Sequence, residues 1–369
     1  MFDLLRSARR PLFIWGAGIR PYAAQALTLA RRWNVPVACT WGAIDLMHYD
    51  DPLMAGGFGT HGTRAANFAV QNSDLVISIG SRLDTKATGA PHSFARAARL
   101  IMCDIDAAEI NKFSKLGRQI DIGVNQDART FLDDLEAISY SYSGIWPAHV
   151  RQWRKRYDNP TITWPGINPY MFVKEIAQQT TKDDILCSDT GTALGYLMQA
   201  FPFKGERFLH AFNMTPMGYG LPAAIGASFA TGRRVVLVCG DGSIMMSLPE
   251  LATIARHNLN IKVILLNNQG HAMCRQTQRQ WLGGGYPATS VEGGLGFPQS
   301  FQETASGFGV DVREHLAGLF RSERPCFLEV HIHPDAYLIP QARYGQPLED
   351  QDPQLPREEF NRQMIIPPL

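Results

Sequence analysis

The sequence predicts an α/β protein made of two three-layer α/β/α domains, each built around a mainly parallel sheet. Short, continuous apolar runs alternate with amphipathic stretches through residues 1–138 and again through residues 168–333. Continuous apolar runs are typical of parallel strands that helices cover on both faces. The chain of 369 residues is also too long for one ordinary domain and comfortable for two.

In the first domain, residues 1–138, the apolar runs predict strands at 12–15, 35–39, 75–80 and 100–105. Amphipathic stretches predict helices at 21–33 and 127–138. We expect about six strands in a domain of this kind.

Residues 139–167 have a different composition and predict a linker packed along a domain face. Aromatic residues lie there among three prolines, next to the basic patch RKR at 154–156. Aromatic side chains beside basic ones also occur on nucleic-acid-binding surfaces. The balanced charge of 35 basic and 34 acidic residues argues against that alternative.

The second domain, residues 168–333, repeats the α/β pattern. Strands are expected at 185–187, 208–211, 234–239, 261–266 and 326–332, and helices at 169–179, 219–230, 248–257 and 312–321. The tail, residues 334–369, holds seven prolines and predicts extended chain laid over a surface.

Composition and cysteine usage indicate a soluble cytoplasmic protein with no membrane or nucleic-acid partner. Hydrophobic residues at 45% and charged residues at 19% exclude a disordered or fibrous chain. Five of the six cysteines lie in short apolar runs and none forms a CxxC pair, which is typical of structural thiols in a reducing compartment. The sequence shows neither a signal peptide nor an apolar window of about 20 residues.

The stretch VVLVCGDGSIMMSLPELATIARHNLNIKVILLNNQGH predicts a metal and phosphate site. A buried strand delivers residues 240–243 (GDGS) at its carboxyl end, where open α/β sheets bind ligands. The glycines let backbone N–H groups approach an anion, and Asp241 is a good ligand for a hard cation. A second strand ends at residues 267–268 (NN), which offer amide oxygens. Oxygen donors favour Mg²⁺ or Ca²⁺ over zinc, and Mg²⁺ commonly bridges to phosphates.

GDG, 24 intervening residues and then NN resemble the signature of thiamine diphosphate (ThDP) enzymes, in particular those of the acetolactate synthase and pyruvate oxidase group. NMTPMGYGLPAAIGA at 213–227 and SDTGTALGY at 188–196 are similar to the same family. PLMAGGFGTHGTRAANFAV, SDLVISIGSRLDTKATG and DIDAAEI look like its central domain. The resemblance covers most of residues 10–335. It implies a central Rossmann-like domain followed by a ThDP diphosphate-binding domain.

The resemblance also implies roles for matching residues. Asp241 and Asn268 would bind Mg²⁺ by side chain, and Gly270 by its carbonyl. Met217 matches the bulky residue that holds ThDP in its bent shape, and the carbonyls of Thr215 and Met217 would face the aminopyrimidine. The other residues expected at the cofactor are Gly191, Thr192, Gly240, Gly242, Ser243 and His271, and Met273 joins Met217 as a candidate catalytic residue.

Members of this family begin with a pyrimidine-binding domain whose glutamate activates the cofactor, whereas the match here starts with the central domain near residue 10. We therefore expect a separate polypeptide to supply that domain and its glutamate, in a heteromer such as α₂β₂. A truncated piece of a longer enzyme is the alternative explanation. The implied reaction is decarboxylation of a 2-oxo acid with transfer of the acyl anion to an acceptor carbonyl. Simple 2-oxo acid decarboxylation is the alternative.

Residues 271–286, HAMCRQTQRQWLGGGY, match a family segment of the type GMxxQW. Family carboligases of the acetohydroxyacid type have tryptophan at the position of Thr277, and the nearest tryptophan here lies one helical turn later. This departure implies a different acceptor. Candidate substrate residues are Arg275, Gln276, Gln278 and Trp281, with solvated helix positions as the alternative, and Cys274 stands where some decarboxylases place a glutamate.

Some relatives hold FAD in the central domain through GxR and DxD segments. Gly80-Ser81-Arg82, Gly62-Thr63 and Asp104-Ile105-Asp106 match those segments, so FAD is a second candidate cofactor, although a flavin-free protein is the prediction. Gly16-Ala17-Gly18 lacks the third glycine of a dinucleotide fingerprint. Two other classes stay open: a nicotinamide- or flavin-dependent oxidoreductase, and a catalytically silent member of the ThDP family.

Overall fold

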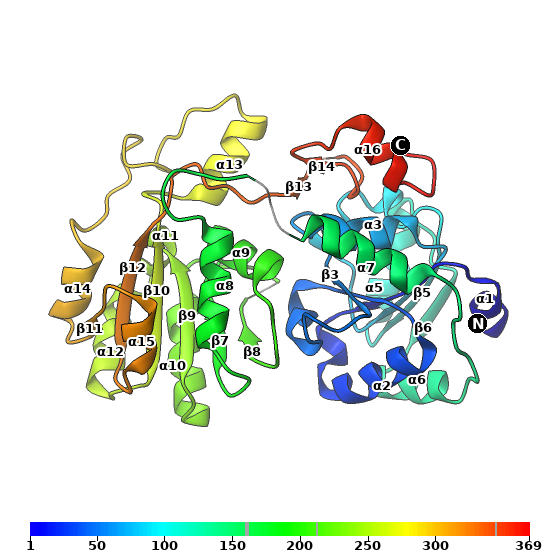
Figure 1. Cartoon of the computed structure of the whole chain (residues 1–369), viewed down its shortest axis with the longest axis horizontal. Helices are drawn as coiled ribbons and strands as arrows, with labels where there is room; N and C mark the ends of the chain where they lie inside the picture. Colours follow the sequence, from blue (N-terminus) through cyan, green and yellow to red (C-terminus); the bar gives the residue numbers. More distant parts are fainter. Residues whose placement is uncertain (159–161, 212, 344) are drawn as a thin grey trace. The chain divides into compact units, whose positions relative to one another are not determined.

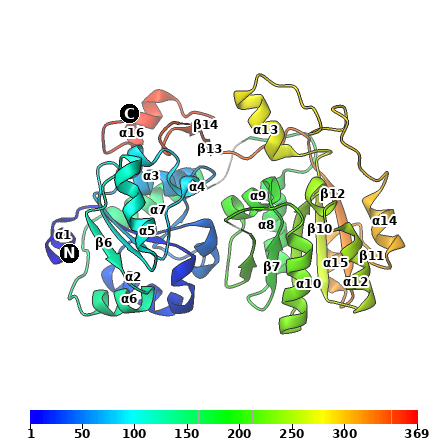
Figure 2. The same cartoon turned by 180° about the vertical axis from the view of Figure 1, so that it is seen from behind.

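The computed structural model describes residues 1–158, 162–211, 213–343 and 345–369. The chain forms two units, Met1–Pro160 with Ile339–Leu369, and Thr161–Leu338. Each unit holds a six-stranded sheet whose strand pairs are all parallel, with helices on both faces (Figures 1 and 2). The predicted α/β class is therefore confirmed.

The sheet of unit 1 has the order β3-β2-β1-β4-β5-β6. Its strands are β1 (Pro11–Trp15), β2 (Val37–Cys39), β3 (Met54–Gly57), β4 (Leu75–Ile79), β5 (Arg99–Asp104) and β6 (Ile122–Asn125). The four predicted strands are confirmed, with small differences at their ends. The sequence pattern missed β3 and β6, because both are edge strands without a continuous apolar run.

Helices cover both faces of this sheet. α2 (Ala23–Trp33) and α6 (Ala128–Glu136) lie together on one face, and α3 (Arg64–Asn72) packs with α7 (Trp146–Tyr157) on the other (Figure 1). Shorter helices are α1 (Phe2–Ser7), α4 (Thr85–Thr88) and α5 (Ala107–Asn111), and 3₁₀ segments span Ala17–Tyr22, Trp41–Leu46, Pro91–Ser93 and Lys112–Leu116.

Helix α7 lies inside the range 139–167, which we expected to be a linker. Its side chains Trp146, Val150 and Trp153 are buried in the core of unit 1, so this part of the range belongs to the domain. Two arginines of the basic patch at 154–156 bind other residues of unit 1. Arg154 donates to the Met54 carbonyl at 3.0 Å, and Arg156 pairs with Glu359 at 2.9 Å.

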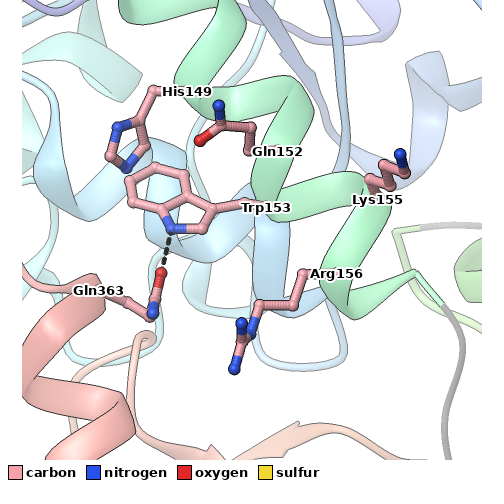
Figure 3. A pocket seen from close by; sticks show the side chains of 6 residues that line it. All are labelled: His149, Gln152, Trp153, Lys155, Arg156 and Gln363. Atoms are coloured by element: carbon pink, nitrogen blue, oxygen red, sulfur yellow. Dashed lines mark hydrogen bonds between the residues drawn. The ribbon is translucent and has the colours of Figure 1, made fainter.

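The C-terminal tail completes unit 1 instead of lying over a surface as extended chain. It forms the antiparallel pair β13 (Gln341–Ala342) and β14 (Gln351–Asp352), followed by helix α16 (Arg357–Gln363). Ala342, Leu348 and Phe360 are buried in the same hydrophobic core as α3 and α7. Figure 3 shows the contact between α7 and the tail, where Trp153 donates its indole N–H to the Gln363 side chain at 2.9 Å.

A buried polar cluster also anchors the tail. The Glu349 carboxylate accepts hydrogen bonds from Gln71 at 2.5 Å and from Arg96 at 2.6 Å, and its side chain is only 1% exposed. Asn67 donates to the Leu348 carbonyl at 3.1 Å. These contacts join residues between 253 and 281 positions apart, so unit 1 is complete only when the tail is in place.

Unit 2 has the strand order β11-β12-β10-β9-β7-β8. Its strands are β7 (Ile185–Ser188), β8 (Arg207–Leu209), β9 (Val235–Gly240), β10 (Ile261–Asn267), β11 (Asp311–Val312) and β12 (Cys326–His331). All five predicted strands are confirmed. The predicted helix at 312–321 is wrong at its start, because Asp311 and Val312 pair with β12 at the sheet edge and the helix covers only Leu316–Arg321.

The helices of unit 2 form a layer on each face. α8 (Pro169–Gln179), α9 (Thr192–Ala200) and α15 (Leu316–Arg321) lie on one face, and α10 (Gly220–Thr231), α12 (Leu251–Arg256) and α14 (Phe301–Gly307) pack on the other (Figures 1 and 2). α11 (Asp241–Ile244), the 3₁₀ segment Leu248–Glu250 and α13 (Ala272–Trp281) complete the unit.

The cysteines lie where their sequence context predicts, with five buried and Cys274 exposed. Within the described ranges, no helix combines the length and the apolar character that crossing a bilayer requires.

We predict that Glu349→Ala lowers the free energy of unfolding of unit 1 by about 3 kcal/mol, because it leaves Arg96 and Gln71 without their buried partner. Urea unfolding followed by tryptophan fluorescence measures this change, since five of the seven tryptophans lie in unit 1. The control is Glu358→Ala on α16, whose side chain is 85% exposed. Equal loss of stability in the two variants would contradict the assignment.

Candidate cofactor-binding site

Three loops of unit 2 meet at one edge of its sheet. They follow β7, β9 and β10, which are neighbouring parallel strands, so the loops leave the same carboxyl edge side by side. The strand order also reverses here, because β8 lies on one side of β7 and β9 on the other. Open α/β sheets bind ligands in the crevice at such a reversal.

Asp241 is the buried centre of this edge. Its side chain is held by three backbone N–H groups: Gly242 donates to Oδ1 at 2.7 Å, and Asn268 and Gly270 each donate to Oδ2 at 3.1 Å. The residue is 1% exposed, and this burial raises the pKa of Asp241 to about 6, although the backbone donors oppose the shift. The carboxylate therefore ties the loop after β9 to the loop after β10.

The site offers oxygen ligands for a cation. The Asn268 side-chain oxygen is buried and has no hydrogen-bond partner among the described residues. An unpaired buried amide oxygen is costly unless a ligand satisfies it. Asp241, Asn268 and the Gly270 carbonyl would together supply the hard, oxygen-only donors that Mg²⁺ prefers.

Glycines at 242 and 270 are required by close contacts. A Cβ on Gly270 would lie 2.5 Å from the Thr289 carbonyl oxygen, and one on Gly242 would lie 2.2 Å from the His271 ring. The half-buried His271 imidazole thus sits directly over the GDG turn. Burial, and to a lesser degree the neighbouring Arg275 guanidinium, lower the pKa of His271 and so favour the neutral ring.

The third loop, which follows β7, offers a candidate anion-binding position. Gly191 has φ 92° and caps the nine-residue helix α9, and a Cβ there would meet no atom within 4 Å. Open space in front of a helix N-terminus, next to the buried Thr192 hydroxyl, is a suitable place for a phosphate. Ser243, which the sequence also assigned to the diphosphate, instead donates to the Gly240 carbonyl at 3.2 Å in this structure.

Asp189 is a candidate site residue that sequence reasoning missed. Its buried carboxylate accepts from the backbone N–H groups of Thr190 at 2.8 Å, Gly218 at 3.1 Å and Gly220 at 2.8 Å. It thereby fixes the turn that carries Met217. The signal was present, because an acidic residue lies two positions after the strand predicted at 185–187, within the motif SDTGTALGY.

The turn before α10 is strained where its carbonyls are expected to face a ligand. Thr215 has φ 46°, a left-handed conformation that β-branched residues rarely adopt. Met217 is 36% exposed, so it is not an ordinary core residue. Met273 is half-buried at the start of α13, and its carbonyl accepts from the Thr277 hydroxyl in the same helix at 3.1 Å.

The candidate substrate residues on α13 do not form one group. Arg275 and Gln276 are buried and bond to the backbone of residues 334–338. Gln278 accepts from the Thr289 hydroxyl at 2.7 Å, and Trp281 is 44% exposed. A substrate contact stays a prediction for all four, and the structure shows another role for the first two.

The segments proposed for FAD in unit 1 have structural roles of their own. Gly18 donates to the Gly80 carbonyl at 3.0 Å, and a Cβ on Gly16 would lie 2.1 Å from the same oxygen. Thr63 caps α3, and Asp104 accepts from the backbone of Asp106 at 2.9 Å. The close contact between the loops after β1 and β4 is thus a structural reason for glycine at positions 16, 18 and 80 that does not involve a flavin.

Comparison with known proteins agrees with this geometry. Residues 1–135 match the family described as "Thiamine pyrophosphate enzyme, central domain", and residues 189–330 match "Thiamine pyrophosphate enzyme, C-terminal TPP binding domain". The chain belongs to the thiamine pyrophosphate enzymes. The two matched domains of this ThDP enzyme correspond to units 1 and 2, and neither match is to a pyrimidine-binding domain.

Curated relatives of this ThDP enzyme include acetolactate synthases. The chain is 32% identical to the acetolactate synthase isozyme 2 large subunit of Escherichia coli (strain K12), over 89% of the chain and 61% of that protein. It is 31% identical to the acetolactate synthase large subunit of Parasynechococcus marenigrum (strain WH8102), over 89% of the chain and 55% of that protein. It is 28% identical to acetolactate synthase 1, chloroplastic, of Oryza sativa subsp. japonica, over 94% of the chain and 57% of that protein. The chain therefore spans less than two thirds of the length of these relatives.

We predict that Asp189→Asn weakens ThDP binding at least about tenfold. The two carboxylate oxygens of Asp189 accept hydrogen bonds from the N–H groups of Gly218 and Gly220, and an asparagine would place its NH₂ group against one of these donors. That hydrogen bond would be lost and the turn that carries Met217 would no longer be fixed. Calorimetric titration with ThDP in excess Mg²⁺ measures the affinity. Asp183→Asn, an exposed position just before β7, is the matched control and should bind as the wild type does. Unchanged affinity in Asp189→Asn would show that the turn does not depend on this carboxylate.

We also predict that divalent-cation affinity falls about tenfold per pH unit below pH 6 and is nearly constant above it. Burial raises the pKa of Asp241 to about 6, so the proton competes with the cation below that value. The ionised carboxylate costs stability in the metal-free protein above pH 6, and this cost disappears as pH falls toward the ordinary pKa of 3.8. Titration with Mn²⁺ alone, without ThDP, avoids ionisation of the diphosphate. A flat affinity between pH 7 and 5 would contradict the prediction.

Proposed function

We propose that this chain is the cofactor-binding subunit of a ThDP- and Mg²⁺-dependent enzyme that decarboxylates a 2-oxo acid and transfers the acyl group to an acceptor carbonyl, as in acetolactate synthase. The observation that carries the proposal is the buried donor set of Asp241, Asn268 and Gly270, placed beside the open N-terminus of α9. This arrangement suits a cation that bridges protein oxygens to a diphosphate.

The residues of the chain bind and orient the cofactor. Bound ThDP supplies the electron sink that allows CO₂ to leave a 2-oxo acid. Asp241 and Asn268 would hold the cation, while Gly191 and Thr192 would receive the diphosphate at the start of α9. The His271 ring, whose lowered pKa favours the neutral form, would hydrogen-bond an oxygen of the cofactor. Asp189 fixes the turn from which Met217 would support the rings of the cofactor.

Exposed apolar side chains near the site support a partner domain. Four methionines close to the site are at least 36% exposed, namely Met214, Met217, Met245 and Met246. Helix α10 has no charged residue, yet Gly226 and Phe229 on it are exposed, Phe229 by 56%. Apolar helix surfaces of this kind are usually covered by another protein surface. We propose that a pyrimidine-binding domain on another polypeptide covers them and supplies the activating glutamate, for example in an α₂β₂ heteromer.

The identity of the acceptor is a narrower part of the proposal. Thr277 stands at the position of the tryptophan in acetohydroxyacid carboligases, and its hydroxyl is engaged within α13 by the Met273 carbonyl. We propose an acceptor other than a second 2-oxo acid on this ground. A simple 2-oxo acid decarboxylase is the second candidate, because it needs no acceptor pocket.

The chain alone should bind ThDP with Mg²⁺ in a calorimetric titration but should release CO₂ from pyruvate or another 2-oxo acid only after a polypeptide with a pyrimidine-binding domain is added. Asn268→Ala should lose both properties because it removes a cation ligand, whereas Asn111→Ala, an exposed residue of α5, should lose neither. Full CO₂ release by the chain alone would contradict the need for a partner. Absence of ThDP binding by the wild type would contradict the cofactor assignment.

A further inference from the structure

Residues 334–338 form a short strap in unit 2 that has no regular secondary structure, and its last three residues are nevertheless buried. They follow β12 and lie beside α13 (Figure 1). Ala336 and Leu338 have no exposed surface, and Tyr337 is 9% exposed. A buried irregular segment must find partners for its backbone groups within the protein. Those partners come from two helices that each carry part of the cofactor site.

Helix α13 holds the strap from the side of the metal loop. The Gln276 amide donates to the Leu338 carbonyl at 2.9 Å and accepts from the Leu338 N–H at 3.1 Å, so one side chain satisfies both backbone groups of that residue. Arg275 donates to the Pro334 carbonyl and, at 3.3 Å, to the Asn268 carbonyl. One buried guanidinium therefore joins the strap to the loop that offers the cation ligands.

Helix α9 holds the strap from the other side. The Tyr196 hydroxyl donates to the Ala336 carbonyl. The Leu338 side chain packs over Gly195, where a Cβ would lie 2.2 Å from Leu338 Cδ1. Both contacts come from the first two turns of α9, directly after Gly191 and Thr192. Glycine at 195 is therefore required by the strap and not by the helix, because α9 has ordinary geometry there.

We propose that this strap sets the position of the α9 N-terminus relative to the metal loop, with Gln276 and Arg275 as positioning residues. The inference rests on the proposed function, because it assigns the strap a role in holding the ThDP diphosphate and its cation. A ligand that contacts two separate loops binds more tightly when the loops are already in place, since ordering them would cost free energy. No strap residue belongs to the expected cofactor contacts, so the effect passes through α9 and α13.

Loosening the strap from either side should therefore disturb both loops. Gln276→Ala removes the two bonds to Leu338, and Gly195→Ala displaces its side chain from α9. We expect each variant to lower ThDP affinity in excess Mg²⁺ by about tenfold to a hundredfold, as loss of residues that orient metal ligands commonly does. Gln276→Glu, which keeps the bond from the Leu338 N–H, should have an intermediate effect. The matched control is Gln280→Ala, the same substitution at an exposed position of α13.

The deciding experiment is hydrogen exchange on the full-length chain without cofactor, followed by the ThDP titration. Faster exchange at residues 189–193 and at 268–271 in both Gln276→Ala and Gly195→Ala, with no change in Gln280→Ala, supports the strap. Faster exchange confined to residues 334–338, with both loops unchanged, would overturn it. Because exchange is measured without ThDP, it tests the strap even if the wild type fails to bind ThDP, a result that would overturn the proposed function instead.

Discussion

The cofactor site depends on the burial of one carboxylate. Asp241 leaves water when the sheet of unit 2 forms, and this transfer is unfavourable unless hydrogen bonds replace those lost. Three backbone N–H groups from two loops donate these replacement hydrogen bonds, and the same bonds fix the positions of the two loops. The remaining cost appears as a raised pKa, which makes the site favourable for a cation that neutralises the charge. The buried carboxylate of Asp189, which follows the neighbouring strand β7, also accepts hydrogen bonds from backbone N–H groups. It thereby fixes the turn that carries Met217.

Segments far apart in the sequence complete both units. In unit 1 the tail fills the core over α3 and α7 and provides Glu349 as the partner of buried Gln71 and Arg96. In unit 2 the strap provides backbone partners for the buried Gln276 amide and, in the Pro334 carbonyl, one acceptor for the buried Arg275 guanidinium. The stretch between β12 and the C-terminus thus contributes to both units, in each case because buried polar side chains need partners from outside their own elements.

Sequence motifs located residues that the fold brings together. Asp241, Asn268 and Gly270 come together as expected, because neighbouring parallel strands bring their carboxyl ends to one edge. The residues on α13 were harder to interpret. A helix of mixed polar residues does not reveal which side it buries, and only the folded chain shows that Arg275 and Gln276 face inward. Asp189 escaped attention because its role requires the turn at 218–220, about 30 residues away.

The sequence by itself determined the α/β class, most of the central strands and the family, since apolar runs and short glycine-rich motifs depend on local chemistry. Only the tertiary structure decided the edge strands β3, β6 and β11, the inclusion of α7 and the tail in unit 1, and the strap. Edge strands are short and need not be continuously apolar. The tail and the strap are held by contacts across large sequence separations, which no local pattern records, because their stability comes from partners that folding alone brings together.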